Sequence, residues 1–123
     1  MVNSNQRFGR RGEDKAAQFL ESLGWVILAR NWTCSEGEVD IVAHDPDADA
    51  LVVVEVKTRS GIGYGSPLET ITFAKVLRLR QLAAIYARLK GGRTRLLRVD
   101  AIGIVWPPGG QCELVHARGI EEL

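Results

Sequence analysis

The sequence predicts one α/β domain over residues 1–123, in which a mixed β-sheet is flanked by two helices. A chain of 123 residues has the usual size of a single domain. Two segments show the apolar spacing of amphipathic helices, and residues 51–58 between them favour a β-strand more strongly than any other stretch. Together with the turn signals that separate the segments, these observations predict the order α-β-β-β-α-β-β.

The first half of the chain is expected to form a helix followed by three strands. The helix is predicted over about 7–23, with Gly24 as its C-terminal cap. Its inward positions share helical i, i+3, i+4, i+7 spacing and are Ala16, Phe19, Leu20 and Leu23. The strands are predicted over residues 25–31, 38–44 and 51–58. Because a short turn at 45–50 joins the last two, we expect them to form a hairpin, with 51–58 as the central strand.

The second half is expected to form a long helix and two more strands. A loop with several glycines precedes a helix over about 70–89, which Gly91 and Gly92 end. Its inward stripe is predicted to be Leu79, Leu82, Ala83 and Tyr86. The last two strands are predicted over 95–105 and 111–117, joined by a tight connection at 107–110.

Composition narrows the class of protein and its environment. No apolar run approaches the roughly 20 residues of a membrane span, and the N-terminus lacks the apolar core of a secretion signal, so we expect no membrane contact and a cytoplasmic location. Cys34 and Cys112 are far apart, which favours reduced thiols over a zinc site or a disulfide. His44 and His116 are equally isolated, and we assign them no role.

Basic residues are concentrated in one segment. The net charge is only +1, yet residues 71–99 contain no acid and eight bases. The bases are Lys75, Arg78, Arg80, Arg88, Lys90, Arg93, Arg95 and Arg98. A solvated helix face explains part of this run, and a surface that contacts phosphates explains it equally well.

Two charged side chains interrupt the expected central strand. Because side chains alternate across a strand, Glu55 and Lys57 emerge on the same face, about 7 Å apart along the chain. Charges within such an apolar strand require partners, since their desolvation costs several kcal/mol. By itself the pair is consistent with a structural ion pair or with a functional one.

Asp40 adds a second acid in the middle of the neighbouring expected strand. If residues 38–44 and 51–58 form a hairpin, Asp40 can meet Glu55. Two adjacent carboxylates repel each other, and a hard cation such as Mg²⁺ or Mn²⁺ allows both to stay ionised. Lys57 beside such a metal could orient or deprotonate an attacking water and neutralise charge on a phosphate.

At these residues the chain resembles the YraN-like proteins of bacteria. This family is similar to archaeal Holliday junction resolvases and to restriction endonucleases of the PD-(D/E)xK type. The resemblance covers nearly the whole chain and rests on motifs at residues 12–14, 29–32, 37–42, 54–59, 65–67 and on Lys75. It implies a restriction-endonuclease-like fold. Val39 stands where the motif's name has proline, and the acids are unaffected.

The resemblance also implies roles for particular residues. Asp40, Glu55 and the carbonyl of Val56 would hold the metal, with Lys57 as the catalytic lysine. Glu13, on the first helix, matches the acid that approaches the metal, often through water, and is counted with the catalytic and metal-binding residues.

Four basic residues are expected to contact nucleic acid, and they are Lys75, Arg78, Arg59 and Arg11. Lys75 would project from the start of the long helix toward the site, although a solvent-facing lysine is an equal alternative. Arg11 is also explained as part of an exposed helix end. Asp100 is expected to form an ion pair outside the site, and the three tryptophans are expected to serve packing.

The leading functional hypothesis is a metal-dependent endonuclease that cleaves DNA, with branched DNA resembling a Holliday junction as a candidate substrate. A homodimer is expected by analogy with resolvases, which act as symmetric pairs. The main alternative is a non-catalytic nucleic-acid-binding or partner-binding module that keeps the fold. A small-molecule phosphoesterase fits the metal site but gives the basic segment no role.

Overall fold

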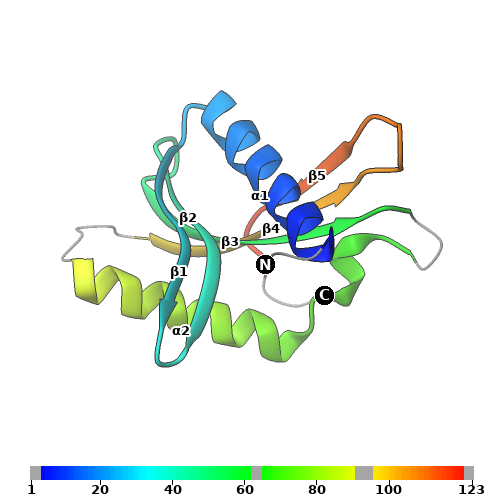
Figure 1. Cartoon of the computed structure of the whole chain (residues 1–123). Coiled ribbons are helices and arrows are strands. Elements are labelled where there is room, and N and C mark those ends of the chain that lie inside the picture. The colour runs from blue at the N-terminus through cyan, green and yellow to red at the C-terminus, as the bar shows by residue number, and fades with distance from the viewer. Residues whose placement is uncertain (1–3, 62–64, 91–95, 121–123) are drawn as a thin grey trace.

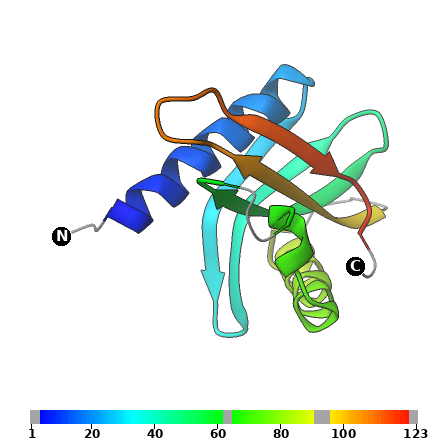
Figure 2. The ribbon, with the colours of Figure 1, turned by 90° about the vertical axis from the view of Figure 1, so that its right-hand side faces the viewer.

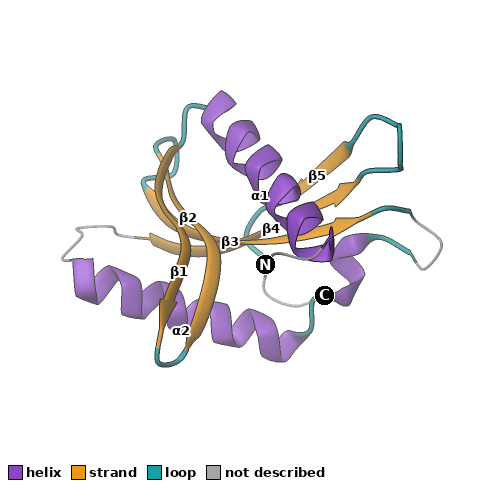
Figure 3. Cartoon of the chain, in the orientation of Figure 1, coloured by secondary structure: helices purple, strands orange, loops and turns teal. Residues whose placement is uncertain are grey.

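The chain forms three layers, with one five-stranded sheet between two helices (Figure 1). The computed structural model describes residues 4–61, 65–90 and 96–120. Figure 3 shows the helices packed outside the strands. The elements, in chain order, are α1 (Ser4–Ser22), β1 (Val26–Cys34), β2 (Gly37–Asp45), β3 (Ala50–Arg59), the 3₁₀ helix η1 (Pro67–Thr70), α2 (Phe73–Lys90), β4 (Leu96–Val105) and β5 (Glu113–Ala117).

The sheet is mixed, as the sequence predicts. Its strand order is β1-β2-β3-β4-β5, and neighbours are antiparallel except for β3 and β4, which are parallel. Parallel neighbours need a crossover connection, and η1 and α2 provide it. Strand β3 lies at the centre, which confirms the expectation drawn from its apolar run.

Each face of the sheet is covered by one helix (Figure 2). On one face, Ala16 and Leu20 of α1 pack against Ile41, Val52 and Ile102 of the strands. On the other face, α2 presents the predicted stripe, and its residues Leu79, Leu82, Ala83 and Tyr86 are all buried. The two apolar stripes therefore place the helices on opposite sides of β3.

The hairpin of β1 and β2 extends beyond the sheet to pack on α2. Trp32 meets Tyr86 edge to face with 5.2 Å between ring centroids, and a Cβ on Gly37 would lie 3.4 Å from Leu82. Strand β1 is longer than expected because it continues through Asn31, which adopts a left-handed φ of 52°. Asparagine tolerates this conformation better than most residues.

The predicted long helix begins at Phe73, about three residues later than expected, and the short helix η1 precedes it within the expected loop. Ser66 caps η1 by accepting a hydrogen bond from the Leu68 N–H, and Ile71 is extended. Thr72 then caps α2, because its Oγ1 accepts a hydrogen bond from the Lys75 N–H at 3.1 Å. Pro67 and the β-branched residues that follow it explain why a single helix does not form here.

Arg98, which belongs to the basic segment, takes part in a buried ion-pair network. Arg98 contacts Asp45 through Nη1 at 2.9 Å and Asp100 through Nε at 2.9 Å, while His116 Nε2 lies 2.8 Å from Asp100. Burial favours a higher pKa for Asp100, but hydrogen bonds from His116 and Arg98 outweigh it and hold the pKa below its usual value. The ion pair expected for Asp100 is confirmed, and the Arg98 guanidinium is engaged by two buried acids.

Helix α1 approaches β3 closely at Gly12. A Cβ at this position would collide with Oγ1 of Thr58 and would lie 2.9 Å from its Cβ. Since the threonine Cβ is fixed by the backbone, no rotation of its side chain relieves the collision. Gly12 therefore sets the spacing between α1 and β3, and with it the position of Glu13.

We expect Gly12→Ala to destabilise the protein by roughly 1–3 kcal/mol, because the added methyl overpacks a closed contact. Gly9 is the matched control: it lies on the same helix, and a Cβ there would meet nothing within 4 Å. Gly9→Ala should gain about 0.5–1 kcal/mol from helix propensity. Urea denaturation of both variants measures the difference. Equal changes in the free energy of unfolding would show that the contact is not tight.

Candidate active site

The predicted site lies where β2 and β3 stop pairing. Their antiparallel ladder ends with the pair Ile41 and Val54, so Asp40 and Glu55 would form the next pair in this register. The strands form no such backbone pair. Instead, Oδ2 of the Asp40 carboxylate accepts a hydrogen bond from the Val56 N–H at 2.8 Å. The hairpin predicted from sequence thus brings both acids to one place.

Asp40 and Glu55 are close enough to share a proton. Burial raises the pKa of Asp40, and repulsion from Glu55 raises it further, to about 7, although the Val56 N–H works against both effects. The two side chains are also joined by a hydrogen bond that favours the protonated form. Near neutral pH this pair therefore holds a proton that a cation could replace.

Two lysines surround the buried carboxylate of Glu55. Oε2 of Glu55 lies 3.5 Å from Nζ of Lys57 and 3.6 Å from Nζ of Lys75. The Glu55 side chain is 6% exposed, whereas those of Lys57 and Lys75 are 33% and 41% exposed. Each ammonium can therefore contact a ligand in solvent while it neutralises the buried acid.

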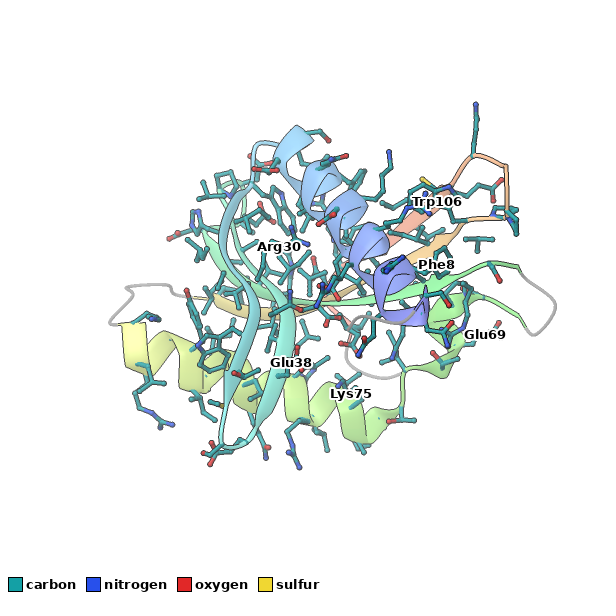
Figure 4. All side chains as sticks on the ribbon, viewed as in Figure 1. Phe8, Arg30, Glu38, Glu69, Lys75 and Trp106 are labelled. Carbon is teal, nitrogen blue, oxygen red and sulfur yellow. The ribbon has the colours of Figure 1, made fainter. Side chains whose placement is uncertain are left out.

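Lys75 reaches the site from the first turn of α2. Figure 4 shows it on the helix below the sheet, and its ion pair with Glu55 fixes the direction of the side chain. The sequence left a site-facing and a solvent-facing lysine equally open, and the structure selects the first. Leu79, four residues after Lys75, is fully buried on the inward stripe. Because residues i and i+4 lie on the same face of a helix, Lys75 also points toward the sheet.

Glu13 approaches the site from the opposite face, on α1. It interacts electrostatically with Asp40, and its Oε1 is buried without a hydrogen-bond partner among the described residues. Burial raises the pKa of Glu13, while a hydrogen bond with Asn31 and the charge of Arg30 oppose the rise. An unpaired buried carboxylate oxygen is uncommon and indicates a missing ligand or water.

Asn31 is a site residue to which sequence reasoning gave no role. Its side chain hydrogen-bonds Glu13, and its backbone is one of two non-glycine positions with positive φ among the described residues. Strained backbone conformations concentrate at functional sites. Asn31 lies within the motif at residues 29–32, which could have drawn attention to it. The spacing of residues along the chain does not reveal that its side chain contacts an acid on the preceding helix.

Two surface grooves open beside Glu13. One has a volume of about 350 Å³ and is bordered by Glu13, Val56, Lys57 and Arg59. The other, of about 460 Å³, is bordered by Glu13, Asn31 and Glu38. Glu13 is therefore accessible from solvent along α1, and the first groove brings a ligand to Lys57 and to the backbone of Val56.

The donor set is compatible with a hard divalent cation. Asp40 and Glu55 supply adjacent carboxylate oxygens, and Glu13 supplies the unpaired oxygen. Because the Val56 N–H points at Asp40, the carbonyl of Val56 faces the same edge of β3. In the described part of the chain, no group of three or more acids, histidines or cysteines is placed to hold a metal ion, so Asp40 and Glu55 are the carboxylates available for direct contact. The arrangement suits an ion that keeps several waters, as Mg²⁺ does.

The remaining basic residues of the prediction are distributed around the site. Arg59 is exposed beside Lys57, and Arg11 stacks on Trp106 with its Cζ 4.2 Å from the ring centroid. Arg78 donates a hydrogen bond to the backbone carbonyl of Glu36 at 2.6 Å. Their contact with nucleic acid stays a prediction. Arg93 and Arg95 lie outside the described residues.

Comparison with known proteins identifies the family. The sequence model of a family described as "Uncharacterised protein family UPF0102" matches residues 12–104. The chain belongs to this family. The resemblance to YraN-like proteins is therefore confirmed. The matched residues include Glu13, Asp40, Glu55 and Lys57.

Relatives within the UPF0102 family share almost half of their residues with this chain. A UPF0102 protein of Clavibacter michiganensis is 49% identical over 89% of this chain and 92% of its own. One of Pseudarthrobacter chlorophenolicus is 47% identical over 98% and 90%. One of an Arthrobacter species is 47% identical over 97% and 99%.

Among solved structures, a chain titled "Structure of EndoMS-dsDNA2 complex" is similar with a TM-score of 0.42 and 19% identity. The match covers 72% of this chain and 34% of that one, so this chain spans about a third of its length. Neither helix of the described residues is long and apolar enough to cross a membrane.

The raised pKa of Asp40 predicts how stability depends on pH. Between about pH 4 and pH 7 the folded chain keeps a proton that the unfolded chain has lost, so the free energy of unfolding should fall as pH rises through this range. Asp40→Asn removes the titrating group and keeps an oxygen for the Val56 N–H. In EDTA, this variant should lose less stability than wild type between about pH 5 and 8.

Urea denaturation at both pH values measures this difference, and Asp47→Asn is the control. Asp47 is exposed in the turn between β2 and β3, and its replacement should leave the wild-type pH dependence unchanged. If Asp40→Asn retained the full dependence, Asp40 would not hold the proton.

Proposed function

We propose that this protein is a metal-dependent endonuclease that uses Mg²⁺ or Mn²⁺ to hydrolyse phosphodiester bonds in DNA. The observation that carries the proposal is the pairing of Asp40 with Glu55 at the end of the β2–β3 ladder, with Lys57 and Lys75 on either side of Glu55. Branched DNA resembling a Holliday junction is the substrate to which the family resemblance points.

The metal would be held by Asp40, Glu55 and the carbonyl of Val56, with Glu13 acting through water. When bound, it would supply Lewis acidity for the phosphate and would lower the pKa of a water that it binds. Asp40 and Glu55 contribute negative charge that is poorly solvated, which favours a divalent cation over a lone proton above about pH 7.

Lys57 acts on the phosphate that enters the groove it borders. Its ammonium can neutralise charge that develops on the non-bridging oxygens, or hold the attacking water in line with the scissile bond. Lys75 balances Glu55 from the other side, so that Lys57 can leave its ion pair without exposing an unpaired buried carboxylate.

DNA is the partner that the surrounding charges suit. Arg59 and Arg11 lie along the same side as the groove, and Arg78 lies on α2 beyond Lys75. A symmetric DNA branch would engage two copies of the chain, which is the basis for proposing a homodimer. The proposal places the enzyme in the cytoplasm, where bacterial DNA is found.

A second candidate is a non-catalytic DNA-binding or partner-binding module. It is favoured by one feature of the site: Asp40 is joined to Glu55 by a hydrogen bond, and two lysines neutralise Glu55, so these two acids have partners without a metal. Both candidates predict salt-sensitive DNA binding, and they differ in metal dependence.

Cleavage of a four-way junction, a duplex and a single strand in Mg²⁺, Mn²⁺ or EDTA separates the two candidates. We expect cutting in either metal and none in EDTA, with a loss of about 100-fold or more in Asp40→Ala and Lys57→Ala. Asp47→Ala is the matched control, because it removes an exposed aspartate far from the site and should cut normally. Metal-independent binding with no cutting would favour the module.

Metal binding can be measured without DNA. Mn²⁺ should raise the melting temperature of wild type at about pH 8, because it binds the folded state. Asp40→Asn should lose this stabilisation although it folds. A rise of equal size in wild type and variant would place the ion elsewhere.

A further inference from the structure

A third groove, which we call the aromatic groove, lies between the N-terminal half of α1 and the connection from β4 to β5. It has a volume of about 520 Å³, and its lining includes Asn5, Phe8, Arg11, Ser60 and Trp106. Among the described residues that line it, none is acidic. It is not part of the acid and lysine cluster of the active site.

The aromatic groove continues into the groove that contains Lys57. Asn5 and Phe8 border both, and Arg59 and Ser60 are consecutive residues on the floor of the two grooves. The backbone ties them together, because the Trp106 N–H donates a hydrogen bond to the Arg59 carbonyl at 2.7 Å. This bond extends the parallel pairing of β3 and β4, so the separation of Trp106 from Lys57 is fixed by the sheet.

Two aromatic rings border the aromatic groove, and two cations lie against one of them. Phe8 and Trp106 have ring centroids 6.5 Å apart at 47°, and Figure 4 shows them on the same side of the molecule next to α1. Arg11 Cζ and Lys15 Nζ lie 4.2 Å and 5.7 Å from the Trp106 ring centroid. Rings flanked by cations recur where proteins hold single-stranded nucleic acid, because bases stack on the rings and phosphates contact the cations.

The other two tryptophans have different surroundings. Trp25 is 4% exposed in the core under α1, and Trp32 packs against Tyr86 of α2. Trp106 is half-buried and borders a groove that leads to the active site. The expectation that tryptophans serve packing therefore describes Trp25 and Trp32, whereas Trp106 is partly exposed at a groove, with Arg11 stacked on its ring.

We propose that the aromatic groove holds an unpaired nucleobase of the DNA strand that is cut, stacked on Trp106 beside the phosphate at Lys57. Arg11 and Arg59 supply positive charge to the flanking phosphates. A base within a perfect duplex must first be unpaired and unstacked, which costs a few kcal/mol, whereas a base in a flap or bulge is already free, and a base pair at a branch point has lost stacking on one side. The substrate class is therefore DNA with unpaired nucleotides at the cut, which deepens the proposed nuclease function and rests on it.

The base contact can be measured without cleavage. In EDTA, wild type is titrated into a duplex that carries one unpaired 2-aminopurine in a bulge, whose fluorescence falls when the base stacks on an aromatic ring. We expect quenching by wild type and tighter binding of the bulged DNA than of the same duplex without the bulge. Unchanged fluorescence on binding, or equal affinity for the two DNAs, would overturn the proposal.

Variants locate the contact. Trp106→Ala should abolish the quenching and weaken binding of the bulged DNA roughly 5- to 100-fold, as alanine substitution of base-stacking rings does. Trp106→Phe should keep most of the affinity, and Trp32→Phe, which changes a tryptophan outside the groove, should behave as wild type. Equal quenching by Trp106→Ala and wild type would place the base elsewhere.

A melting curve shows whether Trp106→Ala is folded.

The Arg11→Ala variant is a second test. This variant keeps the Trp106 ring and should weaken binding of the bulged DNA more than that of the matched duplex. The cleavage assay is separate from these measurements. Quenching without metal-dependent cutting would retain the aromatic groove and reject the nuclease, and cutting that is indifferent to Trp106→Ala would reject the groove and retain the nuclease.

Discussion

The backbone pairing of strands β2 and β3 ends at Ile41 and Val54, and the arrangement of the candidate active site depends on this separation. A continued ladder would fill the edge of β3 with backbone hydrogen bonds. Instead, the carboxylate of Asp40 accepts the Val56 N–H, which brings it against Glu55. The opening between the strands is also where α1 contributes Glu13 and α2 contributes Lys75, so elements from both faces of the sheet meet at one edge.

Sequence patterns predicted the fold and the core of the site because both follow from short-range rules. Alternation along the central strand placed Glu55 and Lys57 on one face, and the short turn at 45–50 made Asp40 their neighbour. The partners of Arg98 could not be predicted in this way. Its contact with Asp45 arises because parallel pairing sets the start of β4 beside the start of β3, which is a tertiary result. The role of Asn31 depends likewise on how α1 crosses β1.

Under the proposed function, the site would have two charge states that exclude each other. Without a metal, a proton shared by Asp40 and Glu55 and two ammonium groups at Glu55 leave little net charge. With a divalent cation the proton would leave, and the lysines would be free to turn toward an anionic ligand. In the state without a metal, Oε1 of Glu13 still has no hydrogen-bond partner among the described residues.

The turn between β2 and β3 illustrates how a distant segment can control this chemistry. Asp45 accepts hydrogen bonds from the N–H groups of Asp47 and Ala48, and Asp49 adopts a φ of 50°, so the turn has a defined shape. It lies five residue pairs from Asp40, roughly 17 Å along the ladder. Because a shift of one residue sends every side chain to the other face, adding or deleting a single residue there would turn the Asp40 carboxylate away from Glu55. The length of this exposed turn thus determines which side chains meet at a site five residue pairs away.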